Sequence, residues 1–296
     1  MSKLIPFLLI ALLLLSACAA PPPPQAASSQ PPLIVSAIPD QDPEKLQRLY
    51  GALVDYLSAE LGIPVIYKPV TDYAASVTGF KVGDLDLVWY GGLTGVQARL
   101  QTPGAHAIAQ RDIDPNFMSV FIANPAGGIA SLEDLKGRTF TFGSESSTSG
   151  RLMPQYFLQE AGVTLGDFKG EPGFSGSHDK TIELVTAGAF EAGALNFQVW
   201  KARLADGKVD ESKVAVFYTT PGYYDYHWVL NPAVVERYGA DMAEKIQAAL
   251  LALDSSVAAH KEILDLFGAQ KFIPTSDENY AAIEQIGRET GLIVTQ

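Results

Sequence analysis

Short apolar runs alternate with longer runs of helical spacing along the first half of the sequence. Leu33–Ile38 is apolar throughout, as expected of a strand, and Pro43 suits the first turn of a helix that continues to Glu60. The apolar positions of that helix are Leu46, Leu49, Tyr50, Leu53, Val54 and Leu57. The same pattern predicts strands over 64–68, 86–90, 107–111 and 118–123, and helices over 72–83 and 91–100.

A second alternating series follows a short helical turn at 132–135. It predicts strands over 138–142 and 191–196 and helices over 152–161 and 181–188, then strands over 214–218 and 226–230. The last part is helical, over 232–238, 240–255, 260–266 and 277–290. Alternation of strand and helix predicts a parallel α/β lobe for the first series and a second α/β lobe for the series that follows.

The body from Leu33 to Gln296, about 264 residues, is long for one compact core and sufficient for two lobes. We expect the chain to leave the first lobe near residue 124 and to return near 220. Lobe 1 would then comprise 33–123 and 220–296, and lobe 2 would comprise 124–219.

Residues 1–17 have the pattern of a lipoprotein signal peptide. Lys3 precedes the apolar run Leu4–Leu15, which is shorter than the roughly 20 residues of a membrane-spanning helix. Leu15-Ser16-Ala17-Cys18 resembles the bacterial lipoprotein box, which implies cleavage before Cys18 and a lipid on its thiol. The alternative is an ordinary signal peptide that happens to contain a cysteine. Residues 18–32, rich in proline, would form a tether between the lipid and the body.

Composition narrows the possible partners. The 21 Lys and Arg residues against 33 Asp and Glu give a formal net charge of −12. An acidic surface argues against binding of nucleic acid and against broad contact with anionic lipid, so we expect the membrane to be contacted through the anchor alone. Cys18 is the single cysteine, which excludes a disulfide within the chain and a cysteine-based metal site.

The hydroxyl-rich turn (residues 142–151) is the most distinctive stretch. It follows a predicted strand and precedes a predicted helix, so its backbone N–H groups and the helix N-terminus would face one spot, which suits a small anion. A simple N-cap is the alternative, but a cap needs one hydroxyl. The turn offers five: Ser144, Ser146, Ser147, Thr148 and Ser149.

Other polar residues follow predicted strands. Ligands of open α/β sheets bind outside the carboxyl ends of strands. The segments at those ends are 40–42, 90–94, 144–149, 175–179 and 196–198, and Tyr73 lies at a helix start. Of Trp89 and Tyr90, only one can face each side of a strand. The aromatic run 223–228 could line a cleft or pack a hinge, and packing is favoured.

These segments resemble, in order, the phosphate, phosphite and phosphonate substrate-binding proteins of ABC importers. The resemblance covers residues 34–275, and Ser147-Thr148-Ser149-Gly150 is its most specific motif. The matching motifs are Asp72-Tyr73-Ala74, Asp86-Leu87-Val88-Trp89-Tyr90-Gly91, Ser147-Thr148-Ser149-Gly150 with Pro154, and Gly176-Ser177-His178-Asp179. It implies a two-lobe periplasmic binding protein fold of type II, with the ligand cleft between the lobes.

The resemblance also implies a site and partners. The ligand-binding candidates are Tyr73, Tyr90, Ser147, Thr148, Ser149, His178 and Asp179, to which position adds Asn196 and Arg151. No metal or other cofactor is expected. The expected partners are a small oxyanion and the permease and ATPase of an importer, with the chain acting as a lipid-anchored monomer in the cell envelope.

The identity of the anion stays open at this point. The amino-acid sequence of the turn also resembles a subgroup labelled as selenate binders. Arg151 and Lys180 would favour a small, highly charged anion. An ionised Asp179 can only accept hydrogen bonds. It would therefore favour a phosphonate, phosphite or phosphate that carries a proton over fully deprotonated selenate or sulfate. We rank phosphite or phosphonate first and selenate or sulfate second.

A secreted hydrolase using serine, His178 and Asp179 is the rival class. The turn lacks a Gly-x-Ser-x-Gly elbow, and neighbouring His and Asp residues rarely form the base and orienting pair of a triad. The four histidines lie far apart, without metal-site spacing. We therefore expect a binding protein rather than an enzyme.

Overall fold

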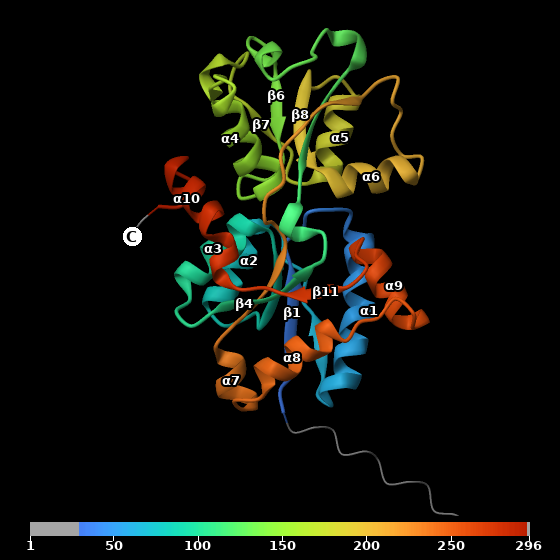
Figure 1. The fold of residues 1–296 in the computed structure, drawn as a ribbon, viewed down its shortest axis with the longest axis vertical. Helices are drawn as coiled ribbons and strands as arrows, with labels where there is room; N and C mark the ends of the chain where they lie inside the picture. Colours follow the sequence, from blue (N-terminus) through green and yellow to red (C-terminus); the bar gives the residue numbers. More distant parts are fainter. Residues whose placement is uncertain (1–29, 295–296) are drawn as a thin grey trace, which may run out of the picture.

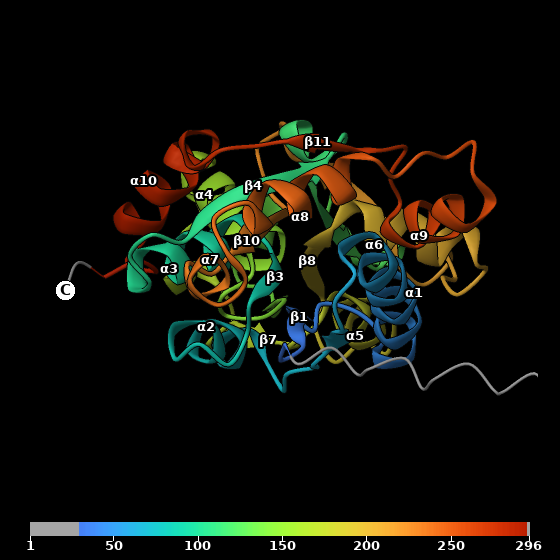
Figure 2. The same ribbon diagram turned by 90° about the horizontal axis from the view of Figure 1, so that it is seen from below.

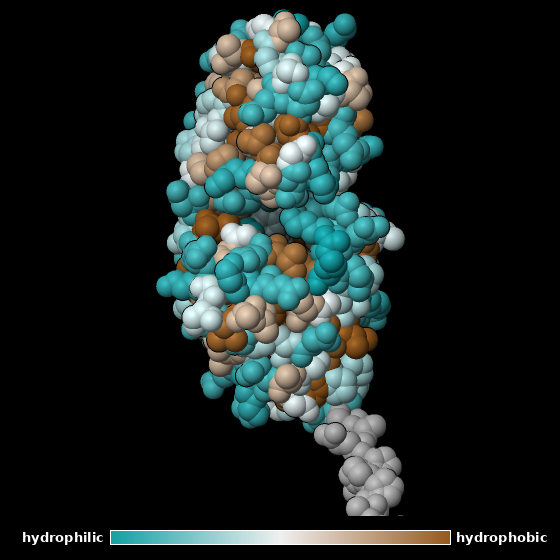
Figure 3. Space-filling view, turned by 90° about the vertical axis from the view of Figure 1, so that its right-hand side faces the viewer, coloured by the Kyte–Doolittle hydropathy of each residue, from teal (hydrophilic) through white to brown (hydrophobic). Residues whose placement is uncertain are grey.

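The computed structural model describes residues 30–294, which form two lobes stacked along the long axis of the molecule (Figure 1). The predicted signal peptide, Cys18 and most of the predicted tether lie outside these residues. The surface is hollowed at the waist between the lobes (Figure 3).

The first lobe is built on a six-stranded sheet in the order β11-β4-β10-β3-β1-β2. Its strands are β1 (Leu33–Ala37), β2 (Val65–Tyr67), β3 (Leu87–Tyr90), β4 (His106–Arg111), β10 (His227–Leu230) and β11 (Phe272–Pro274). Strands β2, β1 and β3 are parallel, whereas β10 is antiparallel to β3 and β4. The expected parallel arrangement holds for β2, β1 and β3, whereas β10 runs the other way because it enters from the waist after the chain has returned from the other lobe.

The second lobe has a five-stranded sheet in the order β7-β6-β8-β5-β9. Its strands are β5 (Ser119–Ala123), β6 (Phe140–Phe142), β7 (Gly173–Phe174), β8 (Ala192–Asn196) and β9 (Ala215–Thr219). Strands β7, β6 and β8 are parallel, and β5 is antiparallel to both β8 and β9. As in the first sheet, three parallel strands are followed by an antiparallel strand. That strand adjoins a crossing, a segment in which the chain passes from one lobe to the other.

Helices cover both sheets. Those of the first lobe are α1 (Pro43–Leu61), α2 (Tyr73–Lys81), α3 (Gly92–Gln101), α7 (Ala233–Tyr238), α8 (Met242–Leu251), α9 (Ala258–Phe267) and α10 (Ala281–Glu289). Those of the second are α4 (Met153–Glu160), α5 (His178–Thr186) and α6 (Phe197–Ala205). In Figure 2, α1 and α9 lie on one side of the strands of the first lobe, and α2, α3 and α10 lie on the other.

The first crossing comes earlier than predicted. Because β5 pairs with β8 and β9, the chain leaves the first lobe before Ser119, and the predicted boundary after residue 123 was wrong. Pattern alone misplaced β5, since a buried apolar strand suits either sheet equally. The return lies between Thr219 and His227. The two crossings touch through the bridge of Phe117 and Tyr223, whose amides and carbonyls pair at 2.8 and 2.9 Å.

Local sequence explains where α1 and α5 begin. Asp42 caps α1 by accepting from the amides of Glu44 and Lys45. Ser177 caps α5 by accepting from the amide of Lys180, so α5 starts at His178, three residues before the predicted start. His178 and Asp179 therefore lie in the first turn of a helix, where a carboxylate is favoured by the helix dipole. The short strands β7 and β11 and helix α6 were not predicted.

Candidate functional site

The hydroxyl-rich turn forms one wall of the space between the lobes. Residues Thr148–Leu152 make a single wide π turn that leads into α4, and the Ser147 hydroxyl caps it by accepting from the amide of Gly150 at 2.9 Å. The amides of Thr148 and Ser149 donate to no acceptor within residues 30–294. The turn therefore provides the N-cap and still leaves donors available to an anion.

Glycines allow the turn to fold this tightly. A Cβ atom on Gly150 would lie 3.0 Å from the Ser147 hydroxyl, 3.1 Å from the Cα of Gly143 and 3.2 Å from Cε1 of His178. The two glycines that bracket the turn thus touch each other, and the His178 ring lies against the second of them. The first turn of α5 is held next to the hydroxyls by this contact.

Thr148 reaches the opposite lobe. Its hydroxyl oxygen accepts from the amide of Leu93, at the start of α3, at 2.9 Å. A Cβ atom on Gly91 would lie only 2.9 Å from that same oxygen. Gly91, predicted as part of a tight turn, is therefore also a point where the two lobes meet closely.

Asp225 comes from the second crossing and was missed by the sequence prediction. It is fully buried, and Oδ1 accepts from the amide of Gly92 at 2.9 Å, whereas Oδ2 has no partner within the described residues. Burial raises the pKa of Asp225 to about 7, although the Gly92 amide and the Thr148 hydroxyl lower it. This carboxyl can accept a further hydrogen bond beside the turn.

Tyr73, the first residue of α2, contributes a further unsatisfied group. Its ring is buried and its hydroxyl has no hydrogen bond of ordinary geometry within residues 30–294. Burial, reinforced by the charge of Asp40, raises its pKa well above the usual value, and the nearby Ser147 side chain lowers it slightly. Tyr73 is therefore a neutral O–H donor facing the turn.

His178 is also neutral, because burial lowers its pKa to about 4. Its Nδ1 accepts from the backbone amide of Asn196 at 3.3 Å, which assigns the proton to Nε2. Nε2 lies 3.4 Å from the Tyr226 hydroxyl. His178 is thus a second neutral donor at the site.

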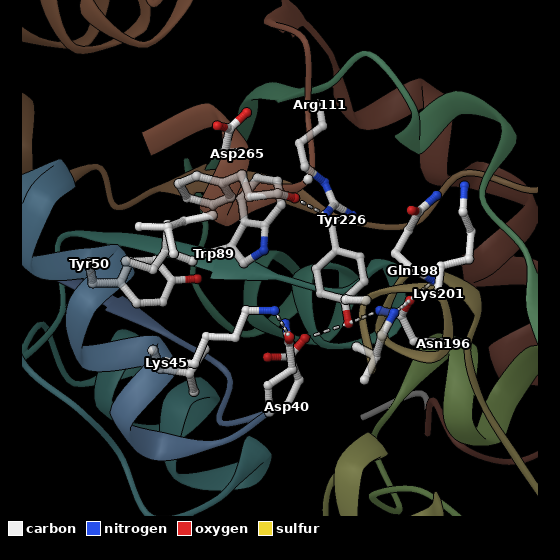
Figure 4. A pocket seen from close by; sticks show the side chains of 18 residues that line it. Asp40, Lys45, Tyr50, Trp89, Arg111, Asn196, Gln198, Lys201, Tyr226 and Asp265 are labelled. Carbon is white, nitrogen blue, oxygen red and sulfur yellow. Dashed lines mark hydrogen bonds between the residues drawn. The ribbon is translucent and has the colours of Figure 1, made fainter. Parts of the chain in front are cut away.

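A clasp of three side chains (Asp40, Tyr226 and Asn196) closes the space around His178. The Tyr226 hydroxyl donates to Oδ2 of Asp40 at 2.7 Å and accepts from Nδ2 of Asn196 at 3.0 Å (Figure 4). Burial raises the pKa of Asp40 to about 6. The aromatic run was expected to pack a hinge, and Tyr223 does so, whereas Tyr226 lines the cleft and joins the lobes.

Ser149 is tied to the hinge. Its carbonyl accepts from the Ser119 hydroxyl at 2.7 Å, and that hydroxyl lies 2.6 Å from the Tyr223 hydroxyl. Ser119 therefore links the turn to Tyr223, on the second segment that passes between the lobes.

Tyr90 points away from the other candidates. Its hydroxyl donates to the backbone carbonyl of Ser76, in α2, at 2.8 Å. The neighbouring Trp89 lines the space between the lobes instead. Strand alternation allows only one of the two to do so, and the resemblance had pointed to the other.

Both carboxylate oxygens of Asp179 accept from protein groups, and one of these groups lies in the opposite lobe. The expectation was a free carboxylate at the ligand. Oδ1 accepts from Nε of Arg203 at 2.5 Å, and Oδ2 accepts from the amide of Asp42 in the opposite lobe at 2.7 Å. Next to it, the His178 amide donates to the carbonyl of Asp40 at 3.0 Å. Lys180 points outward and pairs with Glu183.

Arg151 does not reach the other candidates either. Its guanidinium lies 4.3 Å from the ring centre of Phe142 and 5.2 Å from that of Phe174. Burial lowers its pKa to about 10, and Nε and Nη1 have no hydrogen-bond partner within the described residues. Arg151 stacks between aromatic rings on the lobe, which removes the main reason to favour a highly charged anion.

No helix in residues 30–294 is long and apolar enough to cross a membrane. In the same range, no group of His, Cys, Asp or Glu side chains could hold a metal ion.

Two α/β lobes joined by paired crossings, with polar groups enclosed between them, define the two-lobe class of periplasmic binding proteins. Residues 35–280 match the family described as the periplasmic substrate-binding protein of phosphonate ABC transporters, and the chain belongs to this family. This confirms the resemblance, the fold class and the prediction that the chain is not an enzyme.

The chain is 49% identical over 268 residues to the probable ABC transporter phosphite binding protein PhnD1 of Prochlorococcus marinus (strain MIT 9301), covering 88% of this chain and 90% of that protein. The solved structure of PhnD1 from that organism with methylphosphonate matches with a TM-score of 0.86, over 88% of this chain and 98% of that one. The phosphate-import protein PhnD of Mycolicibacterium smegmatis (strain ATCC 700084 / mc(2)155) is 25% identical over 280 residues, covering 88% and 86%.

Proposed function

We propose that the chain captures a small phosphorus oxyanion of the phosphite or methylphosphonate type between its lobes and delivers it to the permease of an ABC importer. The amides and hydroxyls of Ser147, Thr148 and Ser149 would hold the oxyanion from one lobe, with His178 donating beside them. Tyr73 would donate from the other lobe, and Asp225 would accept from the crossing segment.

One observation carries this proposal. Two fully buried polar atoms, the Tyr73 hydroxyl and Oδ2 of Asp225, lack partners within residues 30–294, and both lie beside the hydroxyl-rich turn. Leaving a buried polar group unpaired costs about 1–3 kcal/mol. A ligand that accepts from the tyrosine and donates to the carboxyl would satisfy both.

Asp225 takes over the role that the sequence suggested for Asp179. Below its pKa of about 7 the carboxyl is protonated and can itself donate, and above that pH it requires a donor. A protonated phosphite or phosphonate oxygen supplies a donor, and selenate or sulfate does not. The names of the relatives, a phosphite binding protein and a complex with methylphosphonate, agree with this choice.

The selenate alternative loses its main support. Arg151 and Lys180 were the reasons to expect a highly charged anion, and neither lies at the site: the first stacks on aromatic rings and the second pairs with Glu183. We keep selenate and sulfate as test compounds only.

A matched pair of tyrosine variants tests the site. Tyr73→Phe removes the unpaired hydroxyl, so binding of phosphite and methylphosphonate measured by calorimetry should weaken about 10- to 100-fold, the worth of a hydrogen bond to a charged group. Tyr90→Phe removes a hydroxyl bonded to Ser76, so unfolding should become easier by about 1 kcal/mol with little change in affinity. The opposite pattern would refute the assignment. Failure of the wild-type chain to bind any phosphorus oxyanion would refute the function itself.

We further propose that Cys18 carries a lipid and that the protein acts as a monomer. The lipoprotein box in the sequence and the proline-rich segment after it support the anchor. Expression with a labelled fatty acid should label the wild type and not Cys18→Ala, which should be released from the membrane fraction. Labelling of both would contradict the anchor. Light scattering with and without phosphite should give the mass of one chain.

A further inference from the structure

A cavity of about 270 Å³ lies between the lobes, outside the clasp of Asp40, Tyr226 and Asn196 (Figure 4). A second cavity of about 360 Å³ adjoins it, and the two share Gln41, Lys45, Val199, Ala202, Asp265 and Leu266. Helices α1 and α6, one from each lobe, contribute to both. We call the first of these the clasp cavity.

Only a thin wall separates the clasp cavity from the hydroxyl-rich turn. Tyr226 and Asn196 line the cavity, and both contact the His178 ring, which lies against Gly150 of the turn. Parting of the lobes would break the bond between Asn196 and Tyr226, and the cavity and the turn would then form one cleft. An anion that approaches between α1 and α6 therefore meets the clasp cavity first.

Hydrogen-bond donors face this cavity. The Tyr50 hydroxyl and the Trp89 indole N–H both line it, and neither has a hydrogen-bond partner within residues 30–294. Both side chains are at least 96% buried, with exposed fractions of 1% and 4%. The Lys45 ammonium donates to Oε1 of Gln41 at 2.7 Å and has further N–H groups. Figure 4 shows the three side chains directed toward the same space.

Lysines and arginines without an ion pair are frequent at the two cavities, although five acids line them as well. Nine lysines and arginines of the described part form no ion pair within 4 Å: Lys45, Arg48, Lys81, Lys136, Arg151, Lys169, Lys201, Lys208 and Lys271. Four of these nine, Lys45, Arg48, Lys201 and Lys208, line one or both cavities. Free cations therefore gather where the cleft opens, although the chain as a whole repels anions.

The nearby acids are mostly engaged. Asp40 accepts from Tyr226, Asp42 caps α1, Asp179 pairs with Arg203, and Asp265 pairs with Lys261. Glu44 and Asp206 also line the second cavity, and both are exposed. The acids thus reduce the attraction without supplying a partner for Lys45 within salt-bridge distance.

We propose that the clasp cavity is an encounter subsite, in which Lys45, Tyr50 and Trp89 hold the incoming oxyanion before it passes to the hydroxyl-rich turn. This rests on the proposed function. Lys45 speeds association through its charge, and the two aromatic donors orient the anion. Once the lobes have closed, the anion lies behind the clasp, so these three residues affect association and not release.

Stopped-flow tryptophan fluorescence with phosphite and with methylphosphonate tests the subsite. Removing one charge at about 5 Å in water changes an encounter population about fourfold. Lys45→Gln should therefore lower the association rate constant about fourfold at low ionic strength and less at 150 mM salt, with the dissociation rate constant unchanged. Tyr50→Phe, which keeps the ring and the charge, should lower association about twofold at both salt concentrations.

Lys81→Gln is the matched control, since Lys81 is exposed, unpaired and outside both cavities. It should leave both rate constants unchanged. A faster dissociation of Lys45→Gln with unchanged association would overturn the proposal, because Lys45 would then act on the closed form. Equal association rates for wild type, Lys45→Gln and Tyr50→Phe would also overturn it. Absence of binding by the wild type would instead refute the proposed function.

Discussion

Replacing Asp179 by asparagine tests whether Asp179 contacts the ligand or holds the two lobes together. In the structure its carboxylate joins Arg203 to the amide of Asp42, so it bridges the lobes. Asparagine keeps one oxygen and loses the charge. We therefore expect Asp179→Asn to weaken binding of every anion that the wild type binds by the same factor.

The size of that factor follows from burial. The two charged side chains expose only 19% and 10% of their surface, so solvent screens the pair only in part. Hydrogen bonds to charged groups contribute about 1.5–3 kcal/mol, and exposed ion pairs contribute less than about 1 kcal/mol. A loss of about 1–2 kcal/mol from the closed form corresponds to a roughly 5- to 30-fold weaker affinity.

Calorimetry with phosphite, methylphosphonate and phosphate, repeated with any of selenate and sulfate that bind, measures this factor. Arg203→Gln breaks the ion pair within the second lobe and leaves the bond to the Asp42 amide, so it should weaken binding less than Asp179→Asn does. The double variant should be little worse than Asp179→Asn alone, because the two residues share one contact. A loss confined to anions that carry a proton would refute the reasoning and return Asp179 to the ligand. Additive losses in the double variant would also refute it.

Three further predictions test the site. Gly91→Ala places a methyl group 2.9 Å from the Thr148 oxygen, so calorimetry should show affinity at least tenfold weaker with similar melting of the unliganded protein; unchanged affinity would contradict this close approach. Arg151→Met removes the stacking on Phe142, so denaturant unfolding should become easier by about 1 kcal/mol, with affinity within twofold of wild type; a large affinity loss would place Arg151 at the ligand. Burial raises the pKa of Asp225 to about 7, so the folded form binds a proton that the unfolded form releases above its ordinary pKa near 3.8. This stabilisation is complete below about pH 4 and is lost as pH rises through 7. Denaturant unfolding at several pH values should show this fall in the free energy of unfolding, and Asp225→Asn should flatten the pH dependence. An equal slope in both proteins would refute the assignment.

Local features of the sequence were sufficient to predict the hydroxyl-rich turn. The strand before it, the helix after it and its two glycines all lie within residues 140–160, so no long-range contact has to be known. Tyr73 follows the same logic, since Asp72 caps α2 by accepting from the amide of Ala75 and thereby fixes where that helix begins. Alternation allowed either Trp89 or Tyr90 to face the cleft, and only the packing against α2 decides.

The crossing segments could not be predicted in this way. Asp225 and Tyr226 lie in an aromatic run that suggests packing. Their contacts depend on residues far away in the sequence: Gly91 and Gly92 for Asp225, and Asn196 of the second lobe for Tyr226. The contacts of Asp179 could not be predicted from the local sequence either. Its position beside His178 matched the family motif, but Arg203 and the Asp42 amide, 24 and 137 residues away, determine its partners.

Asp179 and Asp225 differ in role because their hydrogen-bond partners differ. Asp179 has a guanidinium and an amide as donors, so both oxygens are satisfied and its charge holds the lobes together. Asp225 has one amide and one unpaired oxygen in a fully buried position, where a lone charge is costly. A proton must therefore come to Asp225 from solvent or from the ligand when the lobes close. An anion with a proton to share would meet this demand above the pKa of Asp225, so we expect the proposed site to favour protonated ligands over anions of similar size that carry no proton.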